Sequence, residues 1–357
     1  MLHIKFSFTI LLLILEITMK NDNDNDNNND NDNHNDIFNY KILKKFNFKK
    51  DYFLKKIPVA FSIDHKYIYP LIVLLTSILY NSSPKTYYSF HILVSANFTE
   101  QDLNKFYGLI KIYPNCEFTF FDMGENYKNW KVYAKYTQAV YYRLSLSDII
   151  KDFNKIIYLD IDTIVHKDLT EFYNLEMGKY CYMGFPSHEI GYIEINGTHN
   201  YINSGVMLVN LKELRKKKAT KLFVNYYNKF GTKKIDEYLI NVVFYDKIKF
   251  LPFIYGIPDF EPNPVIESPT VFYKSLKGFC PGTPEDMINA SKNRAITHGA
   301  YKDDKWWSRN YEGLTKIGKS WIFYASKTHL FNEICEKYTN FKNICDKIKA
   351  ENMTKIN

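Results

Sequence analysis

Between residues 57 and 159, short apolar runs alternate with longer segments whose apolar residues recur at helical spacing. The apolar runs predict buried strands over Ile57–Ile63, Tyr88–Val94, Cys116–Phe121 and Lys155–Leu159. The segments between them predict helices over Tyr67–Tyr80, Thr99–Ile112 and Thr137–Ile150. Strand–helix alternation of this kind is typical of an open, mostly parallel sheet with right-handed crossovers. The chain is therefore expected to be an α/β protein.

The second half of the chain alternates less regularly. Val206–Asn210 has the composition of a further strand, and Asp236–Phe244 has helical spacing. The segment Phe250–Pro284 is rich in proline and is expected to consist mainly of loops.

Two acids follow the last predicted strand of the first half, at Asp160 and Asp162. Because side chains alternate along a strand, both carboxylates are expected on one face, with Ile161 on the other. Ligands of open α/β sheets bind beyond the carboxyl ends of the strands. Magnesium and manganese prefer oxygen ligands, so the pair predicts a divalent metal that bridges the phosphates of a nucleotide sugar and acts as a Lewis acid. Two solvated acids at a strand end are the alternative.

The first 56 residues precede the predicted strands and divide into three segments. Residues 1–20 contain the apolar run Phe6–Leu15, which is shorter than the roughly 20 residues of a membrane span and typical of a signal peptide or a retained signal anchor. Residues 21–36 are Asn and Asp apart from one His, which predicts a disordered linker. Residues 37–56 form an uncertain stem.

The sequons and the cysteines give information on the cellular compartment of the chain. Asn-x-Ser/Thr sequons occur at Asn81, Asn97, Asn196, Asn289 and Asn352. Together with the leader they favour a glycoprotein of the secretory pathway, in the lumen of the endoplasmic reticulum or Golgi, either with a type II membrane anchor or secreted. The five cysteines include no CxxC pair, which disfavours a zinc knuckle. Cys335 and Cys345 can bridge in an oxidising compartment, and an odd count leaves at least one free thiol.

The net charge of +8 suits an anionic ligand such as a nucleotide diphosphate. A lysine-rich solvated surface gives the same balance. No nucleic-acid partner is expected.

Six short motifs follow one another between residues 57 and 307. They are Ala60-Phe61-Ser62-Ile63-Asp64-His65-Lys66-Tyr67, Tyr142-Arg143-Leu144, the acid pair, Asn203-Ser204-Gly205, Ile235-Asp236-Glu237-Tyr238-Leu239-Ile240-Asn241, and Thr297-His298 through Lys305-Trp306-Trp307. In content and order they resemble glycosyltransferase family 8, retaining enzymes that include glycogenin and bacterial lipopolysaccharide galactosyltransferases. The resemblance implies the GT-A fold of nucleotide-diphospho-sugar transferases, a mixed, mostly parallel central sheet flanked by helices.

The resemblance also implies a role for each matching residue. The implied metal ligands, for Mn²⁺ or Mg²⁺, are Asp160, Asp162 and His298. The implied donor-binding residues are Asp64, Tyr67, Arg143, Asn203, Ser204, Asp236 and Lys305. Three residues are implied in catalysis: Asp236 and Glu237 at the sugar, and Lys305 at the departing diphosphate. Taken singly, several have structural interpretations too, because acids favour helix N-termini and an arginine often forms a surface ion pair.

Three positions depart from the family pattern. Glu237 stands where the family usually has Gln, and Tyr238 where it often has Asp. The final motif lacks a Gly and a Pro and is one residue longer, so Lys302 is an alternative to Lys305 as the phosphate contact. A carboxylate at Glu237 could act as nucleophile or ion-pair stabiliser, and the neighbouring change leaves the donor sugar open.

The sequence thus predicts a retaining hexosyltransferase that moves glucose or galactose from a UDP-sugar to a glycan, lipid or protein. Its catalytic domain is expected over residues 57–330, followed by a helical tail over 331–357. Two alternatives remain. One is a catalytically degenerate, carbohydrate-binding relative. The other is an aspartyl-phosphate phosphatase, which is disfavoured because the sequence has no later Gly-Asp-x-x-x-Asp motif.

Overall fold

A computed structural model of the chain describes residues 40–46, 55–133, 136–187, 195, 197, 199–232, 235–258, 268–280, 282–299, 305–307 and 316–354. All of them belong to one compact unit, Phe38–Asn357. The predicted leader and linker, residues 1–36, lie outside the described residues, as do Asn196 and Lys302. Their predictions stay untested.

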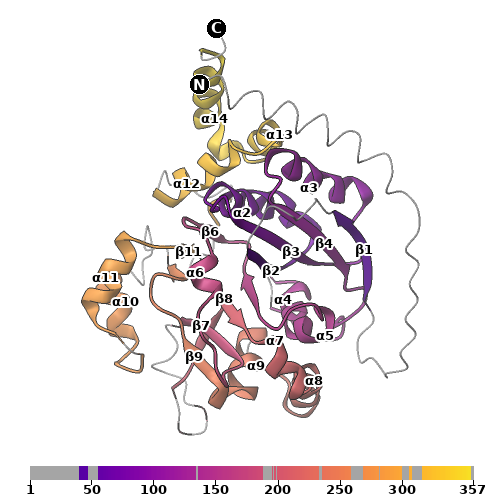
Figure 1. Cartoon of the computed structure of the whole chain (residues 1–357), viewed down its shortest axis with the longest axis vertical. Coiled ribbons are helices and arrows are strands. Elements are labelled where there is room, and N and C mark those ends of the chain that lie inside the picture. Colours follow the sequence, from indigo (N-terminus) through magenta and orange to yellow (C-terminus); the bar gives the residue numbers. More distant parts are fainter. Residues whose placement is uncertain are drawn as a thin grey trace. The chain divides into compact units, whose positions relative to one another are not determined.

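The main sheet of the described part of the chain has eight strands (Figure 1). In spatial order they are β1 (Lys41–Phe46), β4 (Cys116–Asp122), β3 (Thr86–Val94), β2 (Lys55–Ile63), β5 (Ile156–Leu159), β8 (Ile202–Val209), β7 (Tyr182–Pro186) and β9 (Ile248–Phe250). β4, β3, β2 and β5 run parallel, whereas β8 is antiparallel to both β5 and β7. The sheet is mixed: the four predicted strands form one parallel part, and β7 and β9 form a further parallel pair, which confirms the α/β prediction.

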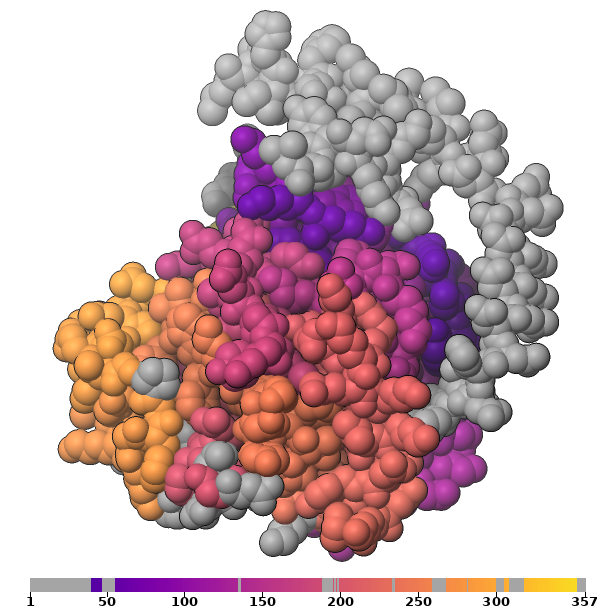
Figure 2. Space-filling view, turned by 60° about the horizontal axis from the view of Figure 1, so that its bottom comes forward, coloured from indigo at the N-terminus to yellow at the C-terminus, as the bar shows by residue number. Residues whose placement is uncertain are grey.

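A second, three-stranded sheet adjoins the end of β5. It consists of β10 (Ile257–Pro258), β11 (Ile296–His298) and β6 (Thr163–Val165). β11 pairs antiparallel with β6, so His298 lies opposite Thr163. This pairing joins a segment near residue 298 to the turn that carries the acid pair. In Figure 2 the part of the chain coloured magenta to orange makes up most of the face toward the viewer.

Residues of the central strands alternate between two hydrophobic cores. On β2, Val59 and Phe61 belong to one core and Ala60 to the other; on β5, Ile157 belongs to the first and Tyr158 to the second. The first core contains side chains of α2 (Ile68–Tyr80), α3 (Glu100–Ile112), α6 (Thr170–Tyr173), α12 (Lys316–Ala325) and α13 (Phe331–Lys337). The second contains side chains of α4 (Ala139–Tyr142), η2 (Arg143–Ser145), α5 (Leu146–Ile149), α7 (Leu211–Lys216), α8 (Ala219–Phe230) and α9 (Asp236–Val243). Helices therefore cover both faces of the sheet, as the period-two pattern of buried strands requires.

Local side-chain chemistry accounts for two helix starts. Thr99 accepts a hydrogen bond from the Asp102 backbone N–H, and the Asp102 carboxylate accepts one from the Thr99 N–H, a capping box that begins α3 at the predicted place. Asp64 likewise caps a helix, but that helix is the short 3₁₀ turn η1 (His65–Tyr67) that precedes α2. The helix predicted over Thr137–Ile150 is divided into α4, η2 and α5.

The prediction of a loop-rich segment over Phe250–Pro284 is wrong in part. The structure places helix α10 at Pro269–Ser275, and α11 (Pro284–Lys292) begins where the segment ends. Both helices carry a proline in the first turn after a Ser or Thr cap, where the missing N–H has no intrahelical partner to lose. Pro269 and Pro284 therefore mark the starts of helices and not loops. The uncertain stem also contributes a strand, β1, which pairs antiparallel with β4.

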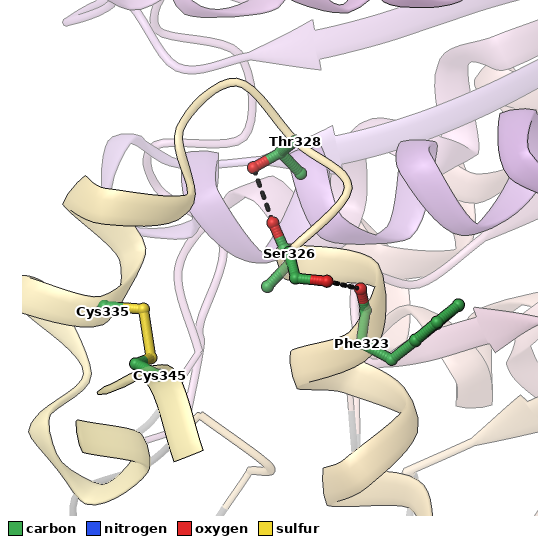
Figure 3. The surroundings of a disulfide bond; sticks show 6 residues. Phe323, Ser326, Thr328, Cys335 and Cys345 are labelled. Atoms are coloured by element: carbon green, nitrogen blue, oxygen red, sulfur yellow. Dashed lines mark hydrogen bonds between the residues drawn. A yellow bond between two sulfur atoms is a disulfide. The ribbon is translucent and has the colours of Figure 1, made fainter. Parts of the chain in front are cut away.

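The C-terminal segment is helical, with η5 (Thr339–Phe341) and α14 (Lys342–Thr354) after α13. A disulfide joins Cys335 of α13 to Cys345 of α14 (Figure 3). The other three cysteines are buried free thiols. Within the described ranges, none of the helices combines the length and the apolar character that a membrane span requires.

Candidate functional site

All eleven predicted site residues line one cavity of about 500 Å³. They are Asp64, Tyr67, Arg143, Asp160, Asp162, Asn203, Ser204, Asp236, Glu237, His298 and Lys305. The cavity lies at the carboxyl ends of β2 and β5 and beside the first residues of β8. Residues far apart in the sequence therefore meet where ligands of α/β sheets bind.

The acid pair lies in a turn and not on a strand, so the predicted strand alternation is wrong. β5 ends at Leu159, and β6 of the second sheet begins at Thr163. The turn is fixed because the Asp160 N–H donates to the Gly205 carbonyl at 2.7 Å, and the Thr163 hydroxyl donates to the Asp160 carbonyl at 2.7 Å. The chain leaves one sheet for the other at this point, and both carboxylates still face the cavity.

His298 completes a group of three candidate metal ligands. Its Nε2 lies 3.3 Å from Asp162 Oδ1 and 3.8 Å from Asp160 Oδ2. One ligand atom from each of the three residues lies within 4.8 Å of the others. Two carboxylate oxygens and an imidazole nitrogen suit a divalent ion such as Mn²⁺. The donor set thus fits the metal that the sequence predicts.

Gly205 on β8 leaves room for this group. A Cβ atom at this position would lie 2.1 Å from His298 Cε1 and 2.8 Å from Asp160 Oδ2. Any side chain there would displace the imidazole or the carboxylate. The Gly205 position in the Asn-Ser-Gly motif therefore requires glycine for close approach, not for backbone conformation.

Arg143 connects the acid pair to the predicted sugar-facing residues. Its Nη2 donates to Asp160 Oδ1 at 2.7 Å, and its Nε forms an ion pair with Asp236 Oδ2 at 3.2 Å. The guanidinium also lies 4.3 Å from the centre of the Tyr158 ring. Burial lowers the pKa of Arg143, but Asp160 and Asp236 outweigh it and hold the pKa above its ordinary value. The arginine is a permanent cation that orients two acids, and not a surface ion pair.

Asp236 and Glu237 begin α9 and are held by the start of β8. The Ser204 hydroxyl donates to Asp236 Oδ2 at 2.9 Å, and Asn203 Nδ2 donates to Glu237 Oε2 at 2.9 Å. Asn241, one turn further along α9, exchanges two hydrogen bonds of 2.8 Å with the backbone of Ile202. Burial raises the pKa of Asp236, Arg143 lowers it and Asp160 raises it again, with a net upward shift.

Lys305 contacts the group of candidate metal ligands through Asp162. Its Nζ donates to Asp162 Oδ2 at 2.5 Å and to the Gly299 carbonyl at 3.1 Å. Burial raises the pKa of the Asp162 carboxyl, but Lys305 and His298 outweigh it and hold that pKa far below its ordinary value. A lysine in this position can neutralise a phosphate oxygen that approaches the same carboxylates.

The remaining lining of the cavity is partly aromatic, and we call its aromatic residues the aromatic wall. Asp64 accepts a hydrogen bond from the Thr137 hydroxyl at 3.1 Å, and Tyr67 follows on η1. Sequence reasoning missed Tyr133 and Tyr136, which line the cavity with 39% and 41% of their surface exposed. No motif marks them, because aromatic residues are abundant along the whole chain. Trp307, the last residue of the final motif, completes this wall.

The mixed sheet, with the acid-lined cavity at its carboxyl edge, has the GT-A fold of the solved structures that the chain resembles. The model of "Glycosyl transferase family 8" matches residues 58–257. The chain belongs to this family, and this membership supports the interpretation of the chain as a glycosyltransferase. The predicted resemblance is confirmed.

Known relatives share moderate identity. A Haemophilus influenzae protein whose name assigns it to the glycosyltransferases is 27% identical over 54% of this chain and 61% of its own length. The galacturonosyltransferase-like protein 4 of Arabidopsis thaliana is 29% identical over 45% of this chain and 51% of its own length. The chain therefore spans about half to three-fifths of these relatives.

Solved structures share the fold at lower identity. The WbbM bifunctional glycosyltransferase has a TM-score of 0.64 at 18% identity, over 82% of this chain and 53% of its own. The galactosyltransferase LgtC, solved with donor and acceptor sugar analogues, has a TM-score of 0.61 at 19% identity, over 76% of this chain and 96% of its own. At such identity the likeness shows the GT-A fold.

Proposed function

We propose that the chain is a metal-dependent, retaining hexosyltransferase that uses UDP-glucose or UDP-galactose. The observation that carries the proposal is the convergence of all eleven predicted residues on one cavity. Its volume of about 500 Å³ lies within the roughly 300–1,000 Å³ typical of small-molecule sites. LgtC, which shares the fold, is a galactosyltransferase solved with donor and acceptor sugar analogues, which supports a sugar donor here as well.

In this proposal different residues of the cavity bind different parts of the donor. Asp160, Asp162 and His298 would hold Mn²⁺ or Mg²⁺, and the bound ion would supply Lewis-acid stabilisation of the diphosphate. Lys305 neutralises a diphosphate oxygen as the bond from the anomeric carbon breaks. Asp64 and Tyr67 contact the nucleotide.

The sugar lies between Arg143, Asn203, Ser204 and Asp236 in this proposal. The bond from the anomeric carbon to the diphosphate oxygen breaks, and a bond to the acceptor oxygen forms on the same face. The acceptor proton passes to the departing diphosphate. Glu237 either stabilises the cationic sugar from the opposite face or attacks it to form a glycosyl-enzyme. The hydrogen bond from Asn203 holds the Glu237 carboxylate in place for either role.

The acceptor and the compartment belong to the same proposal. A glycan, lipid or protein hydroxyl is the expected acceptor, and the secretory lumen is the expected site of action. The disulfide between Cys335 and Cys345 supports an oxidising compartment. A signal peptide or a type II anchor would fit the sequence of residues 1–20.

Donor hydrolysis tests the proposal directly. UDP release is measured with UDP-glucose, UDP-galactose and UDP-galacturonic acid, each with Mn²⁺ and with a chelator. We expect chelator-sensitive release from at least one hexose donor, and nuclear magnetic resonance of the released sugar, recorded before it mutarotates, should show the donor's anomeric configuration. If the chain binds UDP with Mn²⁺ but releases none from any donor, the catalytically degenerate alternative replaces the enzyme.

A further inference from the structure

The disulfide at the C-terminus closes a loop that carries two buried aromatic residues. Cys335 and Cys345 enclose Tyr338 and Phe341, whose exposed fractions are 7% and 2%. We call the segment Phe331–Cys345 the C-terminal clamp. It lies after residues 58–257, the part that the family model matches. Its structural role is therefore not explained by that match.

One chain of ring contacts leads from the clamp to the cavity. Phe341 stacks on Trp321 of α12 with ring centres 5.4 Å apart and planes at 23°. Tyr338 packs edge-on against the same indole at 5.5 Å. Trp321 is 1% exposed and packs on Trp307 at 6.1 Å. Trp307 lines the cavity two residues after Lys305. The clamp thus supports the aromatic wall from behind.

A second set of contacts leads from the clamp to Tyr67. The Tyr69 hydroxyl donates to Glu333 Oε2 at 2.8 Å, and Lys337 Nζ lies 4.7 Å from the centre of the Tyr69 ring. Burial, followed by the nearby phenols of Tyr69 and Tyr67, raises the pKa of Tyr338. The clamp therefore packs on the segment that presents Tyr67 to the cavity.

We propose that the C-terminal clamp positions Tyr67 and Trp307, so that donor affinity depends on the Cys335–Cys345 disulfide. Both cavity residues are held from behind by side chains that the disulfide keeps together. Opening the bond frees α13 from α14 and lets Tyr338 and Phe341 withdraw from Trp321. The residues of the clamp are positioning residues, because they contact Trp321 and Tyr69 and are not among the residues that line the cavity. The inference rests on the proposed function, since it takes the occupant of the cavity to be a nucleotide sugar.

The first test compares two cysteine substitutions. UDP binding with Mn²⁺ is measured by calorimetry for the wild type, for the Cys335→Ser/Cys345→Ser double variant and for Cys280→Ser. Cys280 is a buried free thiol outside the clamp and serves as the matched control. Because small displacements of binding groups are costly, we expect the double variant to raise the UDP Kd about tenfold and the control less than about twofold. Equal UDP affinity in the double variant and the wild type would overturn the inference.

The kinetic constants separate positioning from general damage. The double variant should raise KM for the donor while kcat stays within about threefold, since Asp160, Asp162 and His298 are not touched. Tyr338→Ala should raise donor KM in the same way, whereas Tyr338→Phe, which keeps the ring against Trp321, should restore the wild-type value. A fall in kcat with unchanged donor KM in both the double variant and Tyr338→Ala would contradict positioning.

A third measurement needs no nucleotide. Hydrogen exchange is followed by mass spectrometry, without ligand, for peptides that contain residues 64–70 and 305–307. The double variant should exchange faster in both, while peptides of α8 stay unchanged. Unchanged exchange in both peptides would refute the inference even if the wild type bound no UDP, which would instead count against the proposed function.

Discussion

The cavity has two walls of different construction. The charged wall comprises Arg143, Asp160, Asp162, Asp236 and His298, of which all but Asp160 are at most 6% exposed. The aromatic wall comprises Tyr67, Tyr133, Tyr136 and Trp307, and two of these tyrosines are about two-fifths exposed. The charged wall is held by ion pairs and hydrogen bonds between η2, the turn after β5, β8, β11 and α9. In the aromatic wall, Trp307 packs on Trp321 and Tyr67 packs against the first hydrophobic core.

This difference predicts that the two walls have different roles. Buried ions have few alternative arrangements, because each loss of a partner leaves an unpaired charge in a medium of low dielectric. Packed rings can shift with smaller cost, because their contacts are weak individually and not directional. Substitutions in the charged wall should therefore affect chemistry and folding strongly, whereas substitutions in the aromatic wall should mainly change donor affinity.

The largest effect is expected at Asp162. Asp162→Ala removes a carboxylate that contacts both His298 and Lys305. We expect UDP release to fall by at least about 10³-fold and calorimetric Mn²⁺ binding to disappear, since a metal ligand is lost. Asp246→Ala, at an acid paired with Lys247 away from the cavity, should leave both quantities unchanged. Wild-type turnover in Asp162→Ala would remove the charged wall from the mechanism.

Gly205→Ala should reduce activity nearly as much as Asp162→Ala, although it adds only one methyl group. The added carbon would lie 2.1 Å from His298 Cε1, so the imidazole must move away from the acids. We expect activity to fall by about 10²-fold, the typical cost of a displacement near 1 Å in a catalytic site. Gly231→Ala is the contrasting variant: its φ of +67° makes it strained, yet nothing lies within 4 Å of the added carbon. It should reduce thermal stability and leave Mn²⁺ affinity intact.

Arg143→Leu should affect folding more than the preceding substitutions do. It leaves Asp160 and Asp236 without their shared cation, and removal of one partner from a buried ion pair costs about 3–5 kcal/mol. Urea unfolding monitored by circular dichroism measures this loss. Arg215→Leu is the comparison, because that guanidinium donates mainly to backbone carbonyls, so about 1 kcal/mol is expected. Equal losses in the two variants would show that the charged wall is no more sensitive than an ordinary hydrogen-bonded arginine.

Sequence patterns singled out the residues that meet in the charged wall, but they did not predict the turn and the strand pairing that bring these residues together. The four buried strands were predictable because most of their residues are apolar and polar residues such as Ser62, Ser89 and His91 occur only singly. The strand alternation proposed for Asp160 and Asp162 was wrong, because the chain turns there from one sheet into another. His298 reaches the acids through the pairing of β11 with β6, and no local pattern in the sequence encodes that register.

Sequence patterns did not predict β1, α10 or the two tyrosines of the cavity, and the physical reason differs for each. β1 is an edge strand whose lysines are mostly solvent-exposed, so its apolar pattern is weak. α10 was hidden by a proline that in fact occupies its first turn. Tyr133 and Tyr136 have no motif around them, and only the three-dimensional arrangement places them at the cavity.

The smallest effect is expected in the aromatic wall, at Tyr136. Burial, followed by Asp160, Asp162, Asp236 and Glu237, raises the pKa of Tyr136 to about 12, so its phenol stays protonated up to strongly alkaline pH. Tyr136→Phe keeps the ring and removes the hydroxyl, so we expect donor KM to rise about threefold with kcat nearly unchanged. Because the phenol does not titrate between pH 6 and about 10, the pH–rate profile of the variant should run parallel to that of the wild type. A loss of kcat comparable to that of Asp162→Ala, or a missing limb in the profile, would place Tyr136 with the charged wall.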